Sequence, residues 1–185
     1  GILSQTDENG EFYLRKTNIG NAVTRGVEAF AEYYIPVGNV NLSIFTSTSW
    51  MGGRYKQAFV RVGDSNVSVE DNKIESVPEI ISRNGVNIRF LTASISLLYS
   101  YTAKSFADAL NTKTPNKNGS VGEVPAYGLF DINSSWKISE HVMLRMNINN
   151  VTDKQYFTKR PQFYPGPGVW ASDGRSFVVT VGLTI

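Results

Sequence analysis

Carboxylates and the single histidine are the residues of this sequence most suited to catalysis. Glu28 and Glu32 share one face of a predicted strand, but a spacing of four residues separates them by roughly 13 Å. That is too far for the carboxylate pair of a glycosidase. His141 has no cysteine, second histidine or Ser–Asp pair at a useful spacing, so neither a hydrolytic triad nor a metal site is indicated. We therefore predict that the chain is not an enzyme.

Composition narrows the class of protein. The 185 residues carry 18 basic and 16 acidic side chains without a basic cluster, which argues against nucleic acid as a partner. The chain contains no cysteine, so disulfides, cysteine-based zinc sites and thiol catalysis are excluded. It has no apolar run of about 18 residues that would predict a membrane-spanning helix, and no signal peptide is predicted at Gly1.

Alternation of apolar and polar residues runs through most of the chain and predicts β-strands. In residues 39–50, Val40, Leu42 and Ile44 occupy even-numbered positions, and small polar residues occupy most of the odd-numbered positions between and after them. This period of two residues is typical of a half-buried strand. About eight strands are predicted, several of them longer than the usual five or six residues. They lie within residues 12–19, 24–34, 39–50, 84–90, 92–101, 128–137, 141–150 and 176–185. No helix of convincing period competes, so the predicted fold is all-β.

The connections between these strands alternate in length. The short turns are residues 36–39, 91–92 and 138–141, and the long loops are residues 57–76, 104–125 and 152–175. In an antiparallel up-and-down meander, every short turn then lies at one end and every long loop at the other, as in transmembrane barrels. The stretch near Asn21 is an exception, because it predicts a short connection on the loop side. The long loops are rich in Asn, Gly, Pro, Lys and Ser and are predicted to be solvated rather than core-forming.

Aromatic residues are predicted to form two belts on the apolar face. Trp50, Tyr99 and Tyr101 lie near the loop end, and Tyr33, Phe90 and Trp136 lie near the turn end. Aromatic girdles flank a lipid-facing band about 25 Å tall in outer-membrane barrels, so lipid is the predicted neighbour of the apolar face. The opposite parity carries residues that are predicted to face a water-filled lumen: Glu28, Glu32, Asn87, Arg89, Arg145 and Asn147. The rims of a soluble β-sandwich, whose inner faces also alternate, are the alternative.

Three stretches resemble the TonB-dependent outer-membrane receptors. Residues 149–157, NNVTDKQYF, resemble the Asn-apolar-x-Asp-x-x-Tyr motif that leads from the penultimate strand of these receptors into their last long loop. Residues 174–185, GRSFVVTVGLTI, are similar to their closing strand, and residues 24–34, TRGVEAFAEYY, to their Gly-apolar-Glu strand. Together with residues 158–176, the pattern most resembles the ferric-citrate-receptor-like (iron dicitrate) branch of the family.

This resemblance implies an outer-membrane barrel of 22 antiparallel strands around an N-terminal plug, which imports a ferric siderophore or ferric citrate-like ligand with energy passed through TonB. Residues 1–185 would form one segment, the C-terminal part of the barrel wall with its extracellular loops. The plug, the earlier strands and the TonB-contacting region would lie outside it. An isolated arc leaves two unpaired edges that lipid does not tolerate, so other strands are expected to complete it. The implied partners are outer-membrane lipid, TonB, a ferric chelate and the barrel assembly machinery.

The resemblance also implies that iron enters as a chelated substrate and that the chain needs no cofactor. Ferric chelates are commonly anionic, and the last long loop offers cationic and planar side chains that suit one. The predicted ligand-binding residues are Lys159, Arg160, Phe163, Tyr164, Trp170 and Arg175. The alternative is that these residues only solvate or pack the loop. The last residue departs from the family, since Ile185 stands where these barrels usually end in Phe or Trp.

Two other classes of protein stay open at this point. One is a small complete outer-membrane barrel, porin-like or adhesin-like, of about eight strands. The other is a soluble carbohydrate-binding β-sandwich, which would bury the apolar faces against each other instead of against lipid.

Overall fold

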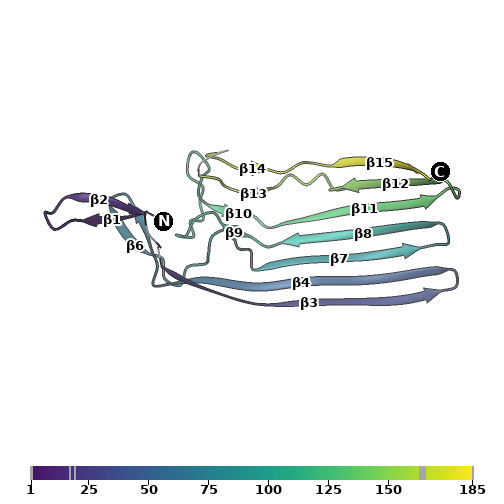
Figure 1. Ribbon diagram of the computed structural model, residues 1–185, viewed down its shortest axis with the longest axis horizontal. Coiled ribbons are helices and arrows are strands. Elements are labelled where there is room, and N and C mark those ends of the chain that lie inside the picture. The colour runs from purple at the N-terminus through teal and green to yellow at the C-terminus, as the bar shows by residue number, and fades with distance from the viewer. Residues whose placement is uncertain (1, 17, 19, 163–165, 185) are drawn as a thin grey trace.

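The computed structural model describes residues 2–16, 18, 20–162 and 166–184. Its main feature is one antiparallel sheet of seven strands in the order β15-β12-β11-β8-β7-β4-β3 (Figure 1). These strands are β3 (Asn21–Val37), β4 (Val40–Lys56), β7 (Ile80–Arg89), β8 (Ala93–Thr102), β11 (Tyr127–Lys137), β12 (Val142–Asn149) and β15 (Ser176–Leu183). Each pairs with its neighbour along the chain, so the predicted all-β, up-and-down antiparallel fold is confirmed. No helix of the described residues is long and apolar enough to cross a membrane.

Short turns join the strands at one end of the sheet, and long loops join them at the other. The turns are residues 38–39, 90–92 and 138–141. The loops are loop A (residues 57–79), loop B (residues 103–126) and loop C (residues 150–175). All three loops emerge at the end of the sheet opposite to the end marked C in Figure 1. The predicted alternation of short and long connections is therefore confirmed.

Within the part of the chain that the structure describes, four two-stranded sheets lie outside the seven-stranded sheet. Loop A contains β5 (Phe59–Val62) and β6 (Ser65–Ser68), loop B contains β9 (Ser105–Phe106) and β10 (Glu123–Val124), and loop C contains β13 (Phe157–Lys159) and β14 (Trp170–Ala171). The fourth pairs β1 (Ile2–Thr6) with β2 (Phe12–Lys16). Each of these two-stranded sheets satisfies part of the backbone hydrogen bonding of its own segment without help from the wall.

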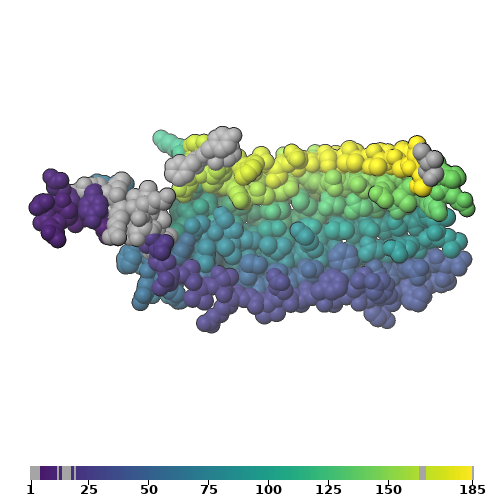
Figure 2. Space-filling view, viewed as in Figure 1, coloured from purple at the N-terminus to yellow at the C-terminus, as the bar shows by residue number. Residues whose placement is uncertain are grey.

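The predicted strand within residues 12–19 does not join the seven-stranded sheet. Its residues Phe12–Lys16 form β2, which pairs with β1 in a hairpin that projects beyond the loop end of the sheet (Figures 1 and 2). A local turn closes this hairpin, because Asp7 accepts hydrogen bonds from Asn9, Gly10 and Glu11. The stretch near Asn21 is therefore not a turn between two wall strands, since it leads from the hairpin into β3. The exceptional short connection predicted on the loop side does not occur.

The strand register gives the sheet one apolar and one polar face. Directly paired residues project from the same side of an antiparallel sheet. One row of such residues crosses all seven strands: Tyr33, Ile44, Val86, Leu97, Ile132, Ile148 and Phe177. Its two ends are the most exposed, with 70% of Tyr33 and 68% of Phe177 accessible. No layer formed by the described residues covers this apolar face, which is typical of a wall that meets lipid.

The aromatic residues of this face lie toward its two ends. Trp50 of β4 and Tyr99 of β8 lie on the loop side, and the ring of Phe130 in β11 packs 4.6 Å from the Tyr99 ring, centroid to centroid. Phe90 lies in the turn after β7, and Trp136 is the residue before the last of β11. This placement agrees with the two predicted belts, and Phe130 extends the belt on the loop side.

The buried apolar side chains of the described residues lie in the loops and at the loop end of β4, not along the wall. A small core contains Tyr55 at the end of β4, Ala58 and Val69 of loop A and Ala109 of loop B. The prediction that the long loops are solvated rather than core-forming is therefore wrong for loops A and B. Wall side chains point away from protein on both faces of a single sheet, whereas the loops fold against one another and exclude water between them.

Gly85 of β7 makes room for the ring of Phe45, its direct partner on β4. A Cβ atom at Gly85 would clash with this ring and lie 3.2 Å from the Leu97 carbonyl oxygen. We expect Gly85→Val to destabilise the full-length folded protein by about 1–3 kcal/mol, the usual cost of overpacking. The measurement is the temperature at which the folded, fast-migrating form disappears from a gel.

The matched variant adds Phe45→Ala to Gly85→Val and removes the ring that the valine would strike. We expect it to recover most of the lost thermal stability. An equal loss with and without the Phe45 ring would show that the ring contact is not the cause.

Candidate functional site

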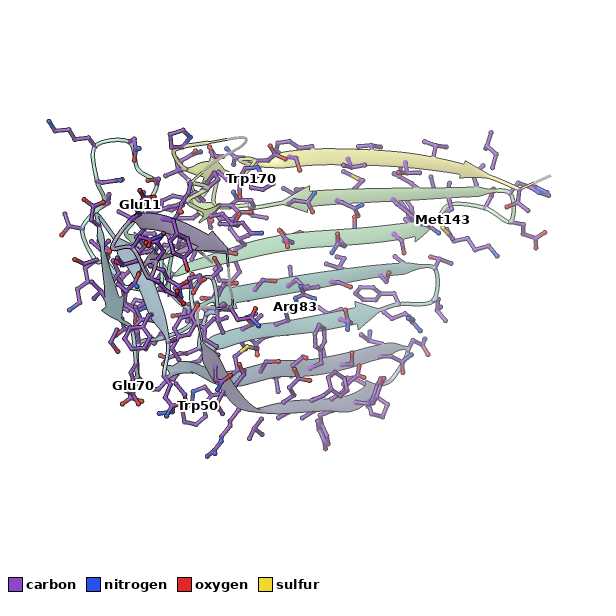
Figure 3. All side chains as sticks on the ribbon, turned by 60° about the vertical axis from the view of Figure 1, so that its left-hand side comes forward. Glu11, Trp50, Glu70, Arg83, Met143 and Trp170 are labelled. Atoms are coloured by element: carbon purple, nitrogen blue, oxygen red, sulfur yellow. The ribbon has the colours of Figure 1, made fainter. Side chains whose placement is uncertain are left out.

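The three long loops meet at one end of the sheet and form the candidate functional site. Figure 3 shows side chains crowded at this end, whereas they spread out singly along the wall. Loops A and B share the small core, because Ala109 packs with Ala58 and Val69. The side chains of the site are therefore carried by loops with a fixed shape, as ligand recognition requires.

Two asparagines join loop A to loop B. The side-chain amide of Asn72 donates a hydrogen bond to the Ala109 carbonyl oxygen at 2.9 Å. Asn111 accepts a hydrogen bond from the Lys73 N–H and donates one to the Lys73 carbonyl oxygen, both at 2.8 Å. Both the oxygen and the nitrogen of the Asn111 side-chain amide are hydrogen-bonded to Lys73 of loop A. This double contact fixes the position of the loop B backbone relative to that of loop A.

Asp108 organises the interior of loop B. Its side chain is buried, and Oδ1 accepts hydrogen bonds from the Leu110 N–H at 3.1 Å and the Thr112 hydroxyl at 2.9 Å. The other carboxylate oxygen faces the Gly122 N–H at 3.4 Å. One carboxylate therefore ties the start of loop B to its end, and such charge-assisted hydrogen bonds are stronger than neutral ones.

Arg160 joins loop C to loop B. Its Nε donates to the Glu123 carbonyl oxygen and its Nη1 to the Gly119 carbonyl oxygen, each at 3.1 Å. The guanidinium carbon also lies 4.7 Å from the centroid of the Phe157 ring. The Glu123 carboxylate binds Lys104 at 2.8 Å, and this hydrogen bond and charge raise the pKa of the Lys104 ammonium. Arg160 thus has structural contacts, which support the alternative that it packs the loop.

Lys159 and Trp170 are the predicted ligand-binding residues that the structure brings together. They oppose each other on β13 and β14, and the Lys159 Nζ lies 5.9 Å from the centroid of the Trp170 ring. Both side chains are exposed. The pair therefore presents a positive charge and a planar apolar surface to solvent at the same point of loop C.

Arg175 lies apart from this pair. Its guanidinium donates to the Val151 carbonyl oxygen at 3.4 Å and lies 5.9 Å from the centroid of the Phe177 ring, where β15 begins. Phe163 and Tyr164 lie outside the described residues. A ligand-binding role for the six residues stays a prediction.

The six residues predicted to face a lumen all lie on the polar face of the sheet. The register pairs Glu28 with Ser49, Asn87 with Ser43 and Arg145 with Thr180. Near the turn end, this face is hollowed by about 490 Å³, and the polar lining includes Glu32, Tyr34, Asn41, Asn87, Arg89 and Ser94. Asn147 lies on the same face, opposite Asn133. That this face lines a closed lumen stays a prediction.

A hydrogen-bonded polar group on the apolar face was not predicted. Thr46 of β4 donates its hydroxyl hydrogen to Asn84 Oδ1 at 2.8 Å, and Asn84 Nδ2 donates to Ser82 at 3.0 Å. The Ser82 hydroxyl also lies 2.7 Å from that of Thr48. Polar groups that face hydrocarbon must be satisfied within the protein. Parity in the sequence places Asn84 on the apolar face, but only the register reveals its partners.

Two comparisons place the chain among known sequences. The model of the family described as TonB dependent receptor-like, beta-barrel, matches residues 2–151. A probable TonB-dependent siderophore receptor, PiuA of Acinetobacter baumannii, is 35% identical over 81 residues, which are 44% of this chain and 9% of that protein.

Solved structures share the fold at low sequence identity. The ferric citrate transporter FecA superposes with a TM-score of 0.75 and 20% identity over 88% of this chain. The PiuA structure from Acinetobacter baumannii gives a TM-score of 0.72 with 21% identity over 98% of this chain, and the copper transporter OprC gives 0.65 with 20% identity over 100%. The chain spans about a quarter of these proteins, namely 24%, 24% and 26% of their chains.

The family match agrees with the seven-stranded meander, its single apolar face and the long loops gathered at one end. Proteins of this family are receptors of the bacterial outer membrane. The family model covers most of the chain, and the structures that share its fold are transporters and receptors. The chain belongs to the family of TonB-dependent receptor β-barrels.

Proposed function

We propose that this chain is the C-terminal part of the barrel wall, with its extracellular loops, of a receptor that imports a ferric chelate across the outer membrane. In this proposal, the plug, the earlier strands and the TonB-contacting region belong to the rest of the protein. The cargo is a ferric siderophore or a ferric citrate-like complex, iron enters only inside that chelate, and the wall holds no cofactor. The partners are outer-membrane lipid, TonB and the barrel assembly machinery.

One observation carries this proposal: three long loops stand together at one end of a wall, and the described residues place no second layer over its apolar face. The loops are held to one another by Asn72, Asn111 and Arg160. In outer-membrane barrels, long loops of this kind lie on the extracellular side, where they meet an incoming ligand first.

Neither alternative class is favoured by the described residues. A small complete barrel would pair its first and last strands, whereas β3 and β15 stand at opposite edges of an open sheet. A β-sandwich would need a second sheet over the apolar face, and the part of the chain that the structure describes forms a single wall with small hairpins in its loops.

The exposed pair of Lys159 and Trp170 suits an anionic ferric chelate. The ammonium supplies charge that a citrate or siderophore carboxylate would bind, and the indole supplies a flat surface for the ligand backbone. PiuA is named as a probable siderophore receptor and FecA as a ferric citrate transporter, which supports ferric chelates as the class of cargo to test.

Cells that express the full-length protein are expected to accumulate radioactive iron supplied as ferric citrate or as a ferric siderophore, and to do so only when TonB is active.

Lys159→Ala with Trp170→Ala is expected to weaken binding of the accepted chelate about tenfold, the effect of losing roughly 1.4 kcal/mol of contact. Binding is measured by titration of the purified protein at low salt.

The control is Lys117→Ala, which removes an exposed positive charge from loop B instead of loop C. We expect it to leave the affinity within about twofold of the unchanged protein, since one exposed charge contributes little. Iron uptake that is independent of TonB would overturn the proposed transport function. Unchanged affinity in the Lys159/Trp170 variant would overturn only the assignment of this pair.

A further inference from the structure

The exposed pair of Lys159 and Trp170 stands on a ribbon of two short strands, β13 and β14, that belongs to loop C and not to the wall. The ladder of this ribbon pairs Phe157 with Ala171 and Lys159 with Trp170, and its register shifts between Phe157 and Lys159. A two-stranded hairpin is only marginally stable by itself in water, even when it is longer than this one. Contacts outside the ribbon must therefore fix the direction in which the pair faces.

The wall holds the ribbon at its base. The Tyr156 ring packs 4.6 Å from the Tyr127 ring, centroid to centroid, where β11 begins. The Tyr156 carbonyl oxygen also accepts a hydrogen bond from the Ser172 N–H at 3.1 Å, which joins the two arms of loop C. Both contacts lie on the wall side of the ribbon, so they would let its outer end pivot unless another contact holds that end.

Arg160, the residue after β13, holds the outer end of the ribbon. Its Nε and Nη1 donate to the carbonyl oxygens of Glu123 and Gly119, each at 3.1 Å, and its guanidinium carbon lies 4.7 Å from the centroid of the Phe157 ring. Because the guanidinium is planar and its N–H groups form a rigid fork, two acceptors and one ring set its orientation. β13 accordingly lies beside β10 of loop B (Figure 1).

The two acceptors belong to a segment of loop B whose shape is fixed by its own side chains. Asn116 Oδ1 accepts a hydrogen bond from the Ser120 N–H at 2.9 Å, and Asn116 Nδ2 donates to the Ser120 hydroxyl at 3.0 Å. The buried Asp108 carboxylate faces the Gly122 N–H at 3.4 Å. Loop B therefore offers Arg160 two carbonyl oxygens at fixed positions.

We propose that Arg160 is a positioning residue for the Lys159–Trp170 pair, which it orients toward an anionic ligand by fastening loop C to loop B. The inference rests on the ligand-binding role proposed above for that pair, and Arg160 needs no contact with the ligand. A ribbon that pivots must be ordered when a ligand binds, and the conformational freedom lost at that moment reduces the affinity. The fork of Arg160 removes this cost before the ligand arrives.

The first test needs no chelate. A nitroxide spin label on Thr158→Cys, an exposed position of β13, reports the motion of the ribbon in the full-length protein with any other cysteine replaced. Arg160→Ala is expected to raise the mobile fraction of the label severalfold. The control is Lys154→Ala, which removes an exposed cation near the start of loop C and is expected to leave the spectrum unchanged.

The second test measures the affinity of the purified full-length protein for ferric citrate. Arg160→Ala is expected to weaken binding about fivefold, less than the loss expected for the pair itself. Because Arg160 acts through the pair, Arg160→Ala is expected to add less than about twofold when Lys159 and Trp170 are already alanine. Arg160→Lys is expected to weaken binding nearly as much as Arg160→Ala, since lysine keeps the charge but not the fork.

Gly119→Val tests the same contact from loop B. Gly119 has a φ of 73°, which a β-branched residue rarely adopts, and a Cβ atom there would lie 3.5 Å from the Gly168 Cα. This variant keeps Arg160 and displaces one of its acceptors, so it is expected to mobilise the label and weaken binding as Arg160→Ala does. Gel mobility of the folded form verifies each variant.

Unchanged label mobility in Arg160→Ala would overturn the inference, and so would an unchanged affinity or a loss that adds in full to that of the pair. Full affinity in Arg160→Lys would show that the charge acts on the ligand directly and would overturn the positioning role. If the unchanged protein bound no ferric citrate, that cargo would be wrong, and the mobility of the label would decide the inference by itself.

Discussion

Val179→Arg in the full-length protein is expected to prevent most of the barrel from reaching its folded form. Val179 lies midway along β15, projects from the apolar face opposite Met146 and is 64% exposed. An arginine at the middle of a lipid-facing strand costs about 2–4 kcal/mol, which is a large part of the stability of an ordinary domain. The measurement is the fraction of protein that migrates as the folded species before heating.

Its control is the adjacent residue, Val178→Arg. Val178 pairs with Asn147 on the polar face, so a charge there has water or polar groups beside it instead of hydrocarbon. We expect this variant to fold nearly as well as the unchanged protein. The two valines differ in the face that they occupy, and equal behaviour of the two variants would contradict a lipid-facing assignment for the apolar side of the sheet.

Asp108→Ala is expected to open loop B while leaving the wall folded. The buried carboxylate accepts hydrogen bonds from Leu110, Thr112 and Gly122, and its loss leaves these donors without their acceptor. Losing one hydrogen bond to a charged group costs about 1.5–3 kcal/mol, so the open population should rise at least about tenfold. Limited proteolysis of the folded protein should cut loop B correspondingly faster, because cleavage follows the population of the open form.

The conservative variant Asp108→Asn tests the physical reason. An amide oxygen can still accept from the Leu110 N–H and the Thr112 hydroxyl, although without the charge. We expect its cleavage rate to lie between those of the unchanged protein and Asp108→Ala. Loss of the folded gel mobility in Asp108→Ala would show that loop B supports the wall, contrary to this prediction.

The wall was predictable because its pattern is local. In β15, Phe177, Val179 and Val181 alternate with Ser176 and Thr180, and a strand has a period of two whichever strand lies beside it. The length of each connection then sets which strands are neighbours in a meander. Strand direction, the apolar face, the turn end and the loop end all follow from these two local features.

The hairpin at the start of the chain shows where that reasoning fails. Residues Phe12–Lys16 have strand character, and β2 is a strand, but its partner is β1 and not β3. Alternation of apolar and polar residues indicates that a segment is an extended strand, but it does not indicate which other strand the segment pairs with. The partner depends on the turn after Asp7, whose carboxylate closes the hairpin within a few residues.

The loops were the least predictable part of the candidate site. Arg160 and Lys159 are adjacent cations in the sequence, yet Arg160 binds backbone carbonyls of loop B while Lys159 lies exposed beside Trp170. Nothing in the residue types distinguishes the two. The difference comes from contacts between segments about 40 residues apart, which a local pattern does not contain.

The sequence by itself determined that this is an all-β wall with one apolar face, one polar face and long loops at one end, because a period of two and the lengths of connections are properties of neighbouring residues. Tertiary structure alone decided which loop residues hold the loops together and how the polar group around Asn84 is satisfied. These depend on register and on contacts across the chain, which arise when strands and loops that are distant in sequence come to lie side by side.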